Sequence, residues 1–258
     1  MSAKLHFAIV LAVAATTLSA RCQQPVCAII PVDANDGPIV APTNHKILYE
    51  SADVRVIEVT LAAHTKEIMH THARPAILYI DGAATQKYIT PANPDPSPRS
   101  FPPRPIAIRL KPEGMHAVED VADTPFHAIR IELKHPGCSL PNGFAPVTLD
   151  ATDALVAAPL NHSIVYEDDD IRILDVHSAA HTREPWHTHA WPGFFYVIQG
   201  IPTRYFTPET PNPPLRPAPA LSRKVIPVAA ETSHSVENMG DTPGHRLRVE
   251  LKHATPAP

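Results

Sequence analysis

The sequence has no long run of one charge and no convincing amphipathic helix, and each absence excludes a class of protein. Its 22 basic and 26 acidic residues give a net charge of −4 and are spread along the chain, so nothing indicates a nucleic-acid surface. The 31 prolines in 258 residues disfavour a helix-rich architecture, because proline inside a helix removes a backbone donor and clashes with the preceding turn. Short runs rich in β-branched and aromatic residues, such as ILYI and FFYVI, instead predict an all-β fold.

The apolar run at residues 7–15 is too short to span a bilayer, which takes about 20 residues. With Lys4 before it and small residues after it, the run resembles an export signal. We therefore expect residues 1–22 to be a signal peptide and the protein to be periplasmic or secreted. A buried strand or a membrane anchor is the alternative, and lipid anchoring at Cys22 is only weakly indicated because no small residue directly precedes it.

The two halves of the chain repeat each other. APTNHKILYE, beginning at Ala41, matches APLNHSIVYE, beginning at Ala158, and the offset of 117 residues becomes 118 after one insertion. Fourteen of the 16 histidines fall at matched positions, and only His6 and His177 are unmatched. The repeat predicts two homologous domains, 41–135 and 158–253, with an N-terminal segment 23–40 and a linker 136–157.

Each copy contains the same histidine motif. His70-Thr71-His72 in the first copy matches His187-Thr188-His189 in the second, and in an extended strand two histidines separated by one residue point the same way. A third histidine, His116 or His234, follows the pair after 44 or 45 residues. Three converging imidazoles indicate an open metal site that leaves positions for water or substrate. Hydrogen-bonded core or surface histidines are the alternative, which retention of the triplet in both copies disfavours. The predicted ligands are His70, His72 and His116 in one site and His187, His189 and His234 in the other.

These motifs resemble those of the cupin family. The first cupin motif reads Gly, five residues, His-x-His, three or four residues, Glu, six residues, Gly. In the second copy, Gly193 stands at the glutamate position and Gly200 at the closing glycine, whereas the first copy has Ala76 and Ala83 there. The second motif ends in His, three residues, Asn, and is similar to HSVEN in the second copy and, less closely, to HAVED in the first. The resemblance implies a bicupin: an all-β protein of two tandem jelly-roll barrels.

The chain departs from the cupin pattern at two positions. His64 and His181 replace the opening glycine of the first motif, and both copies lack the carboxylate ligand. A three-histidine site resembles the minority of cupins that includes acetylacetone dioxygenase and cysteine dioxygenase, and implies a non-haem metal-dependent oxygenase that acts on a small oxygenated substrate. Fe(II) is favoured, and Mn(II), Zn(II), Ni(II) and Cu(II) also suit imidazole. A non-catalytic binding module for a small ligand or metal is the alternative. We expect a small-molecule partner, no nucleic acid and no membrane span, and leave homo-oligomer formation open.

Other matched polar residues surround the motifs. Glu67 and Glu184 lie three residues before a histidine pair, an odd separation that places them on the opposite strand face unless a bend, which Pro185 would permit, turns them back. We expect His64 and His181 to support the site from behind or to lie on the surface. The last strand of each copy alternates charged and apolar residues, and a solvated charged face is the favoured interpretation for Arg130, Glu132, Arg248 and Glu250.

Two proline-rich inserts carry the matched residues Arg99 and Arg216. Each insert is either a surface decoration or a rim over the mouth of a barrel, where its arginine would meet an anionic substrate.

The second copy is the better candidate for chemistry. It keeps more of the cupin pattern, and aromatic residues surround its histidine pair, although an interdomain contact would also explain them. Those aromatics are Trp186, Trp191, Phe194, Phe195 and Tyr196. Trp191 would form a wall of the pocket if the strand continued through Pro192.

Only three cysteines occur in the chain. Cys27 precedes the first repeat and Cys138 follows it, so an oxidising compartment would allow them to close the first domain with a disulfide. Two unpaired cysteines are the alternative.

Overall fold

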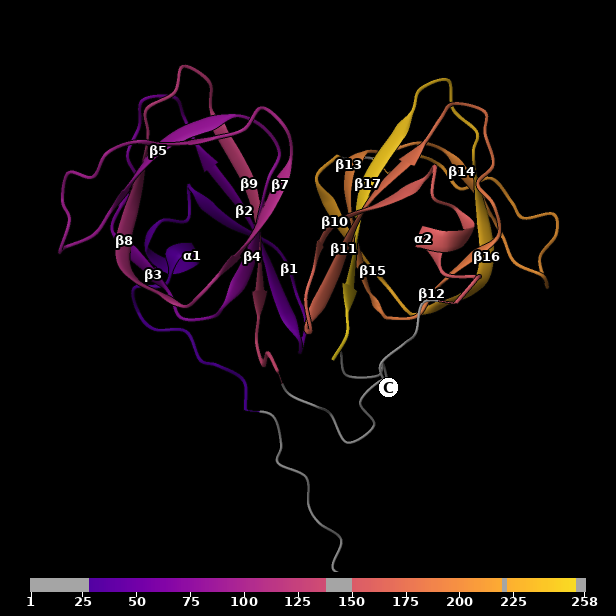
Figure 1. The fold of residues 1–258 in the computed structure, drawn as a ribbon, viewed down its shortest axis with the longest axis horizontal. Helices are drawn as coiled ribbons and strands as arrows, with labels where there is room; N and C mark the ends of the chain where they lie inside the picture. The colour runs from indigo at the N-terminus through magenta and orange to yellow at the C-terminus, as the bar shows by residue number, and fades with distance from the viewer. Residues whose placement is uncertain (1–27, 138–149, 220–221, 254–258) are drawn as a thin grey trace, which may run out of the picture.

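The computed structural model describes residues 28–137, 150–219 and 222–253, which form two barrels side by side (Figure 1). The predicted signal peptide, residues 1–22, and the predicted disulfide between Cys27 and Cys138 lie outside these residues and stay predictions. Within the described ranges, no helix has the length and apolar character that crossing a membrane requires.

Barrel 1 consists of one helical turn and two antiparallel sheets. The first sheet has the strand order β1-β2-β9-β4-β7 and the second has the order β3-β8-β5-β6. The elements are α1 (Gly37–Val40), β1 (His45–Glu50), β2 (Val54–Leu61), β3 (His70–His72), β4 (Ala76–Ile80), β5 (Ala84–Ile89), β6 (Arg99–Phe101), β7 (Ile106–Leu110), β8 (Glu113–Asp120) and β9 (Phe126–Leu133).

Barrel 2 repeats this arrangement. Its sheets have the orders β10-β11-β17-β13-β15 and β12-β16-β14. Its elements are α2 (Ala154–Ala157), β10 (His162–Glu167), β11 (Ile171–Ser178), β12 (His187–His189), β13 (Gly193–Gln199), β14 (Thr203–Phe206), β15 (Lys224–Val228), β16 (Glu231–Asn238) and β17 (Gly244–Leu251). The predicted all-β fold of two tandem jelly-roll barrels is confirmed. The strands lie inside the predicted domain bounds, 41–135 and 158–253, whereas α1 and α2 lie upstream of them.

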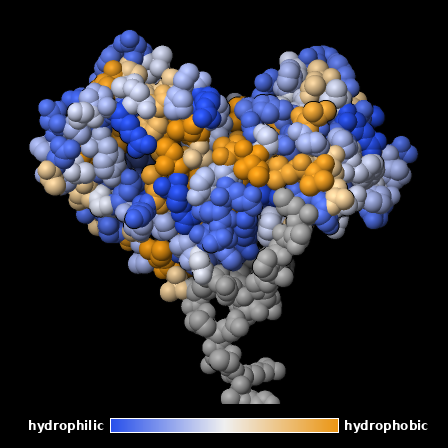
Figure 2. All heavy atoms as spheres, in the orientation of Figure 1, coloured by the Kyte–Doolittle hydropathy of each residue, from blue (hydrophilic) through white to orange (hydrophobic). Residues whose placement is uncertain are grey.

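The five-stranded sheets of the two barrels face each other in the middle of the molecule, and the smaller sheets lie on the outside (Figure 1). One apolar core includes residues from both large sheets, so the two barrels share it. Burying an Ile or Val side chain contributes about 1.5–3 kcal/mol. The fully buried members of this core are Val56, Ile77, Ile129, Ile131, Ile171, Ile173, Phe194, Leu247 and Val249. Figure 2 shows apolar surface gathered along the seam between the two lobes.

Alternation along the central strands decides what lines each barrel. On β9, Ile129 and Ile131 belong to the shared core, while Arg130 and Glu132 point to the other face and are 3% and 0% exposed. Arg248 and Glu250 on β17 are buried in the same way. The expectation of a solvated charged face was therefore wrong, because the apolar face of each sheet packs against the other barrel and leaves the charged face to its own interior.

Gly193 lets two strands of barrel 2 approach closely. It opens β13 at the position of the missing carboxylate ligand and pairs with Glu250 on β17. A Cβ atom at this position would overlap the backbone carbonyl oxygen of Val249. Barrel 1 accommodates Ala76 at the matched position, so the approach of the strands differs between the barrels.

We predict that Gly193→Ala lowers the free energy of unfolding by about 1–3 kcal/mol, the usual cost of inserting a methyl group into a packed interior. Urea unfolding monitored by tryptophan fluorescence measures the change. Gly82→Ala is the matched control, because a Cβ atom there meets nothing within 4 Å. Equal stabilities of the two variants would show that β13 and β17 separate without cost.

Candidate metal centres

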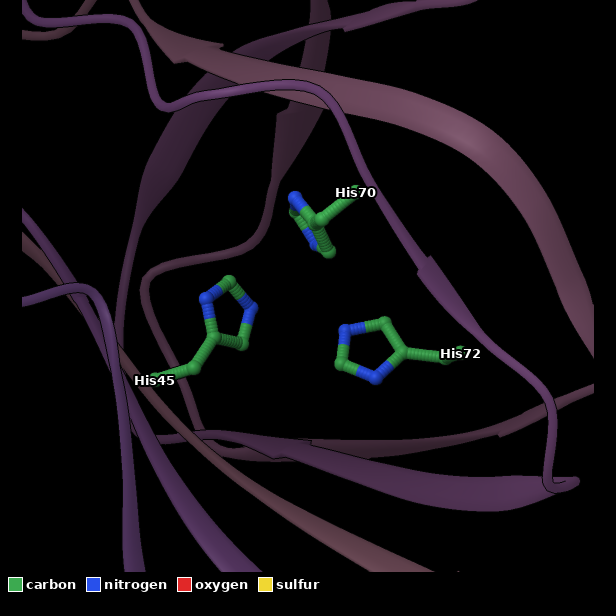
Figure 3. A group of neighbouring side chains, drawn as sticks. All are labelled: His45, His70 and His72. Atoms are coloured by element: carbon green, nitrogen blue, oxygen red, sulfur yellow. The ribbon is translucent and has the colours of Figure 1, made fainter. Parts of the chain in front are cut away.

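Four histidines converge in each barrel. In barrel 1, the register places His70 on β3 opposite His116 on β8, and His45 approaches from β1. The ring centroids of His70 lie 4.4 Å from both His45 and His116 and 5.0 Å from His72. Figure 3 shows the rings of His45, His70 and His72 turned toward one shared space. The structure thus brings together the three predicted histidines and adds a fourth.

Barrel 2 has the same cluster. His187 pairs with His234 across β12 and β16, and their ring centroids are 4.2 Å apart. The ring centroid of His187 also lies 5.2 Å from that of His189 and 4.6 Å from that of His162 on β10. Metal binding by these residues stays a prediction.

His45 and His162 belong to the clusters but were not among the predicted ligands. Both end the matched segments APTNH and APLNH, so the repeat already contained the signal. Their ring nitrogens lie within 4.8 Å of those of the adjacent histidine pair. Spacing could not reveal them, because β1 and β10 reach the site through the closure of the barrel and not through a local motif.

The orientation of the rings fits a bound metal ion. His70 Nδ1 lies 2.8 Å from the carbonyl oxygen of Ile68, and His116 Nδ1 lies 2.8 Å from that of Gly114. A carbonyl can only accept, so each Nδ1 donates and each Nε2 keeps its lone pair. His70 Nε2 is buried and has no hydrogen-bond partner among the described residues. A divalent transition metal would satisfy it. In barrel 2, the carbonyl oxygens of Pro185 and Thr232 have the same function.

A buried carboxylate orients the remaining histidine of each pair. His72 Nδ1 donates to Glu132 Oε1 at 3.0 Å, and His189 Nδ1 donates to Glu250 Oε1 at 2.7 Å. Such a carboxylate fixes the tautomer of a metal-binding histidine and raises its basicity. The charged face of β9 and β17 therefore supports the candidate metal sites.

An ion-pair chain holds each of these carboxylates in place. Arg55 Nε donates to Glu132 at 2.8 Å, and its two terminal nitrogens donate to Asp36 at 2.7 and 2.8 Å. In barrel 2, Arg172 joins Glu250 to Asp153. Removing one partner would leave an uncompensated buried charge, a change that typically costs about 3–5 kcal/mol.

Asp36 and Asp153 precede α1 and α2, outside the predicted repeat bounds. The matched segments DAND and DATD, again 117 residues apart, show that the repeat begins upstream of residue 41. The N-terminal segment and the linker thus each supply one residue that stabilises a candidate site.

Glu67 faces the cluster of barrel 1, so the expected orientation away from it was wrong, while Glu184 lies buried beside Arg246. Both are buried, and Glu67 approaches His70 Nε2 at 3.9 Å and His45 Nδ1 at 3.8 Å. The alternation rule failed because β3 begins only at His70, and the residues before it form no regular strand. Burial raises the pKa of Glu67 to about 8 and that of Glu184 to about 7.

His64 and His181 lie on the surface. Both have a left-handed backbone conformation, with φ of 56° and 54°, and their Nε2 atoms lie 2.9 Å from exposed aspartates, Asp123 and Asp241. They contribute no ring to either cluster.

Burial keeps the clustered imidazoles neutral. It lowers the pKa of His70 and His187 to about 4, and burial together with neighbouring imidazoles lowers the pKa of His45 to about 3 and that of His162 to about 2. The pKa values of the other four histidines are lowered for the same primary reason. Neutral imidazole is the form that binds metal, so each cluster is ready to do so at pH 7.

A cavity adjoins each cluster. It measures about 400 Å³ in barrel 1 and about 250 Å³ in barrel 2. Tyr88 stacks on His116 and Tyr205 stacks on His234, with ring centroids 4.9 and 5.1 Å apart. Arg99 lines the first cavity and Arg216 the second, which agrees with the interpretation of the proline-rich inserts as rims.

One cation lines the second cavity from a strand position that holds no cation in barrel 1. Arg246 lines the second cavity, with its guanidinium 4.5 Å from the Phe195 ring centroid and one nitrogen 3.9 Å from Glu184 Oε1. The matched residue in barrel 1 is the buried Ala128. In barrel 1, Lys111 and Arg130 line the cavity together with Arg99. The two cavities therefore both contain cations and differ in the strand positions that supply them.

The predicted aromatic wall is mostly absent from the second cavity. Phe195 lines it, but Phe194 and Tyr196 belong to the core shared by the barrels, and Trp186 is 43% exposed. Trp191 packs against the Arg172 guanidinium, because the strand ends at His189 and does not continue through Pro192.

No protein-family model and no curated protein matches the chain. Similar solved structures include a cupin 2 conserved barrel domain protein from Leptotrichia buccalis, at 10% identity and a TM-score of 0.42 over 80% of this chain and 88% of that one. Another is oxalate decarboxylase from Bacillus subtilis, a protein with Mn(II) centres, at 12% identity and a TM-score of 0.49 over 80% and 70% of the chains. Likenesses at this level carry no argument about activity or ligands.

We predict that the metal-free protein loses stability as the pH falls from 7 to 5. Each clustered histidine has a folded pKa below its unfolded value of about 6.5, so the unfolded chain binds more protons in this range. Each additional proton costs about 1.4 kcal/mol per pH unit. Glu67 and Glu184 act in the opposite sense, because their raised pKa values favour the folded state at low pH, but eight imidazoles outnumber two carboxyls.

Urea unfolding of chelator-treated protein at pH 7, 6 and 5 measures this slope. A flat or inverted profile would contradict the buried, neutral state of the clusters.

Proposed function

We propose that the protein is a metal-dependent oxygenase that acts on a small oxygenated organic anion. The observation that carries the proposal is the convergence of four neutral imidazoles in each barrel. In barrel 1, fixed acceptors hold the Nδ1 atoms of His70, His72 and His116, which leaves their Nε2 lone pairs for a metal ion. Nitrogen donors of this type suit Fe(II) and neighbouring divalent metals. When bound, such a metal would supply a Lewis-acidic centre with positions open to an oxygenated ligand.

The residues around each cluster have distinct tasks in this proposal. His45, His70, His72 and His116 would hold the metal in barrel 1. Glu67, beside two of these rings, can hold or accept a proton at Oε2, because this atom has no hydrogen-bond partner among the described residues. A carboxyl group with a pKa near neutrality is suited to general acid or base chemistry.

Cations and aromatic rings would orient the substrate. Arg99 and Arg216 stand where a negatively charged group would pass on its way to the metal site. Tyr88 and Tyr205 flank the third histidine of each cluster and form part of the cavity wall. The surrounding apolar side chains exclude water and strengthen the interaction between these charges and a ligand.

We place the chemistry of a small anion in barrel 2. Its cavity is the smaller, and Arg246 presents a guanidinium to it from a strand position that holds Ala128 in barrel 1. The larger cavity of barrel 1 would accept a bulkier ligand.

A non-catalytic binding module is the alternative. It would keep the imidazole clusters and the cavities without turnover. Metal binding alone does not distinguish the two proposals, whereas O₂ consumption does.

We predict that untagged protein binds one divalent metal ion per barrel, and that His70→Ala/His72→Ala loses about one equivalent while barrel 2 keeps its own. Elemental analysis after desalting measures the stoichiometry. His187→Ala/His189→Ala is the reciprocal variant. A variant that lacks all six histidines predicted from the sequence, and that circular dichroism shows to be folded, should bind less metal. Retention of all metal in this variant would contradict the assignment of these histidines as ligands.

An O₂ electrode with the Fe(II)-loaded protein and a panel of β-diketones and small carboxylic acids then tests the reaction. We expect O₂ uptake that His187→Ala abolishes and His70→Ala leaves in place. Loss confined to His70→Ala would move the chemistry to barrel 1. Binding of panel members without any O₂ uptake would favour the binding module.

A further inference from the structure

A second kind of histidine cluster lies on barrel 2, outside the four-histidine centre. Asp175 and His177 on β11 lie next to His245 on β17. Asp175 Oδ1 is 2.6 Å from His245 Nε2, and Asp175 Oδ2 is 3.0 Å from His177 Nε2. The two rings stack with their centroids 4.1 Å apart. Two imidazoles and one carboxylate thus share a single small volume.

The backbone holds these three residues in position. His177 and His245 are directly opposite each other in the antiparallel pair of β11 and β17. Asp175 lies two residues before His177 and therefore on the same face of the strand. The backbone N–H of His177 donates to the carbonyl oxygen of Asn161, and the Asn161 side chain donates to the carbonyl oxygen of His177, both at 2.9 Å. Only the side chains need to adjust to a ligand.

We propose that Asp175, His177 and His245 form a third metal site, which binds a divalent transition metal such as Zn²⁺. Two ligands at about 2.1 Å from such an ion are about 3.0–3.4 Å apart. The 3.0 Å between Asp175 Oδ2 and His177 Nε2 fits this range, and the 2.6 Å between Asp175 Oδ1 and His245 Nε2 would lengthen when an ion binds. The ligand atoms of all three residues lie within 4.8 Å of one another. Neutral imidazole and carboxylate are standard donors for Zn²⁺, Ni²⁺ and Cu²⁺.

The site is accessible from solvent. The side chain of His177 is 54% exposed, while those of His245 and Asp175 are 22% and 24% exposed. The exposed ring can turn to direct Nε2 at an ion without disturbing the core. Water can fill the coordination positions that the protein leaves open.

Barrel 1 provides a built-in control, because its matched positions hold Glu58, Thr60 and His127. Thr60 replaces the exposed histidine, and His127 instead bonds to Asp81 at 2.5 Å and to Glu58 at 3.2 Å. His177 is one of the two histidines that the repeat leaves unmatched. The third site therefore belongs to barrel 2 alone.

Isothermal titration of untagged protein with Zn²⁺, after both four-histidine centres have been saturated, tests the site. We expect one further equivalent per chain for the native sequence, and at least a tenfold loss of its affinity in His177→Thr. Threonine is the residue that barrel 1 uses in the same strand position, so the variant should fold. Native affinity in His177→Thr would overturn the proposal.

His64→Asn is the matched control, since it removes another exposed histidine that also contacts an aspartate, and asparagine tolerates the left-handed backbone at this position. It should leave the further equivalent intact, and equal losses in both variants would show nonspecific surface binding and overturn the proposal. The third site shares no residue with the four-histidine centres. If the four-histidine centres do not bind metal, the native protein and His177→Thr both lack the tightly bound equivalents. Loss of the further, weaker equivalent in His177→Thr alone reports on the third site.

Discussion

The structure depends on burying polar groups in pairs. Each barrel holds four imidazoles and several charged side chains in an interior from which water is largely excluded, and such groups are costly there unless they are bonded. In barrel 1, a series of hydrogen-bonded ion pairs from Asp36 through Arg55 and Glu132 to His72 gives most of these groups a partner. Its counterpart does so in barrel 2. Among the described residues, the buried polar atoms that have no hydrogen-bond partner include His45 Nδ1, His70 Nε2 and Glu67 Oε2 at the cluster of barrel 1.

The pairing of the barrels and the charged interiors are two results of one strand pattern. On β2 and β9, one face presents Val and Ile to the other barrel, and the opposite face presents Arg55, Arg130 and Glu132 to the inside. A single barrel would expose the apolar face to water. Tandem duplication covers that face with its own copy, so the same strands can carry both a core and an ion-pair network.

Several features could be predicted from the sequence because they are local or repeated. The β-rich pattern and the motifs indicated the fold, and the His-x-His pairs and later histidines converge as their spacing suggested. His45 and Asp36 were missed although each has a counterpart 117 residues later, because barrel closure and not local spacing brings them to the site. The faces of Glu67 and Glu132 were misjudged for different reasons: strand alternation does not hold before β3, and nothing local shows that the apolar side of β9 packs on a second barrel.

The central claim is that the converging Nε2 atoms bind a divalent metal. X-ray absorption at the metal edge of untagged protein tests it most directly. We expect a first shell of nitrogen and oxygen donors at about 2.0–2.2 Å, together with the outer scattering of three or four imidazole rings per ion. A shell that lacks imidazole scattering, or protein that retains no metal after loading at pH 7, would contradict the account.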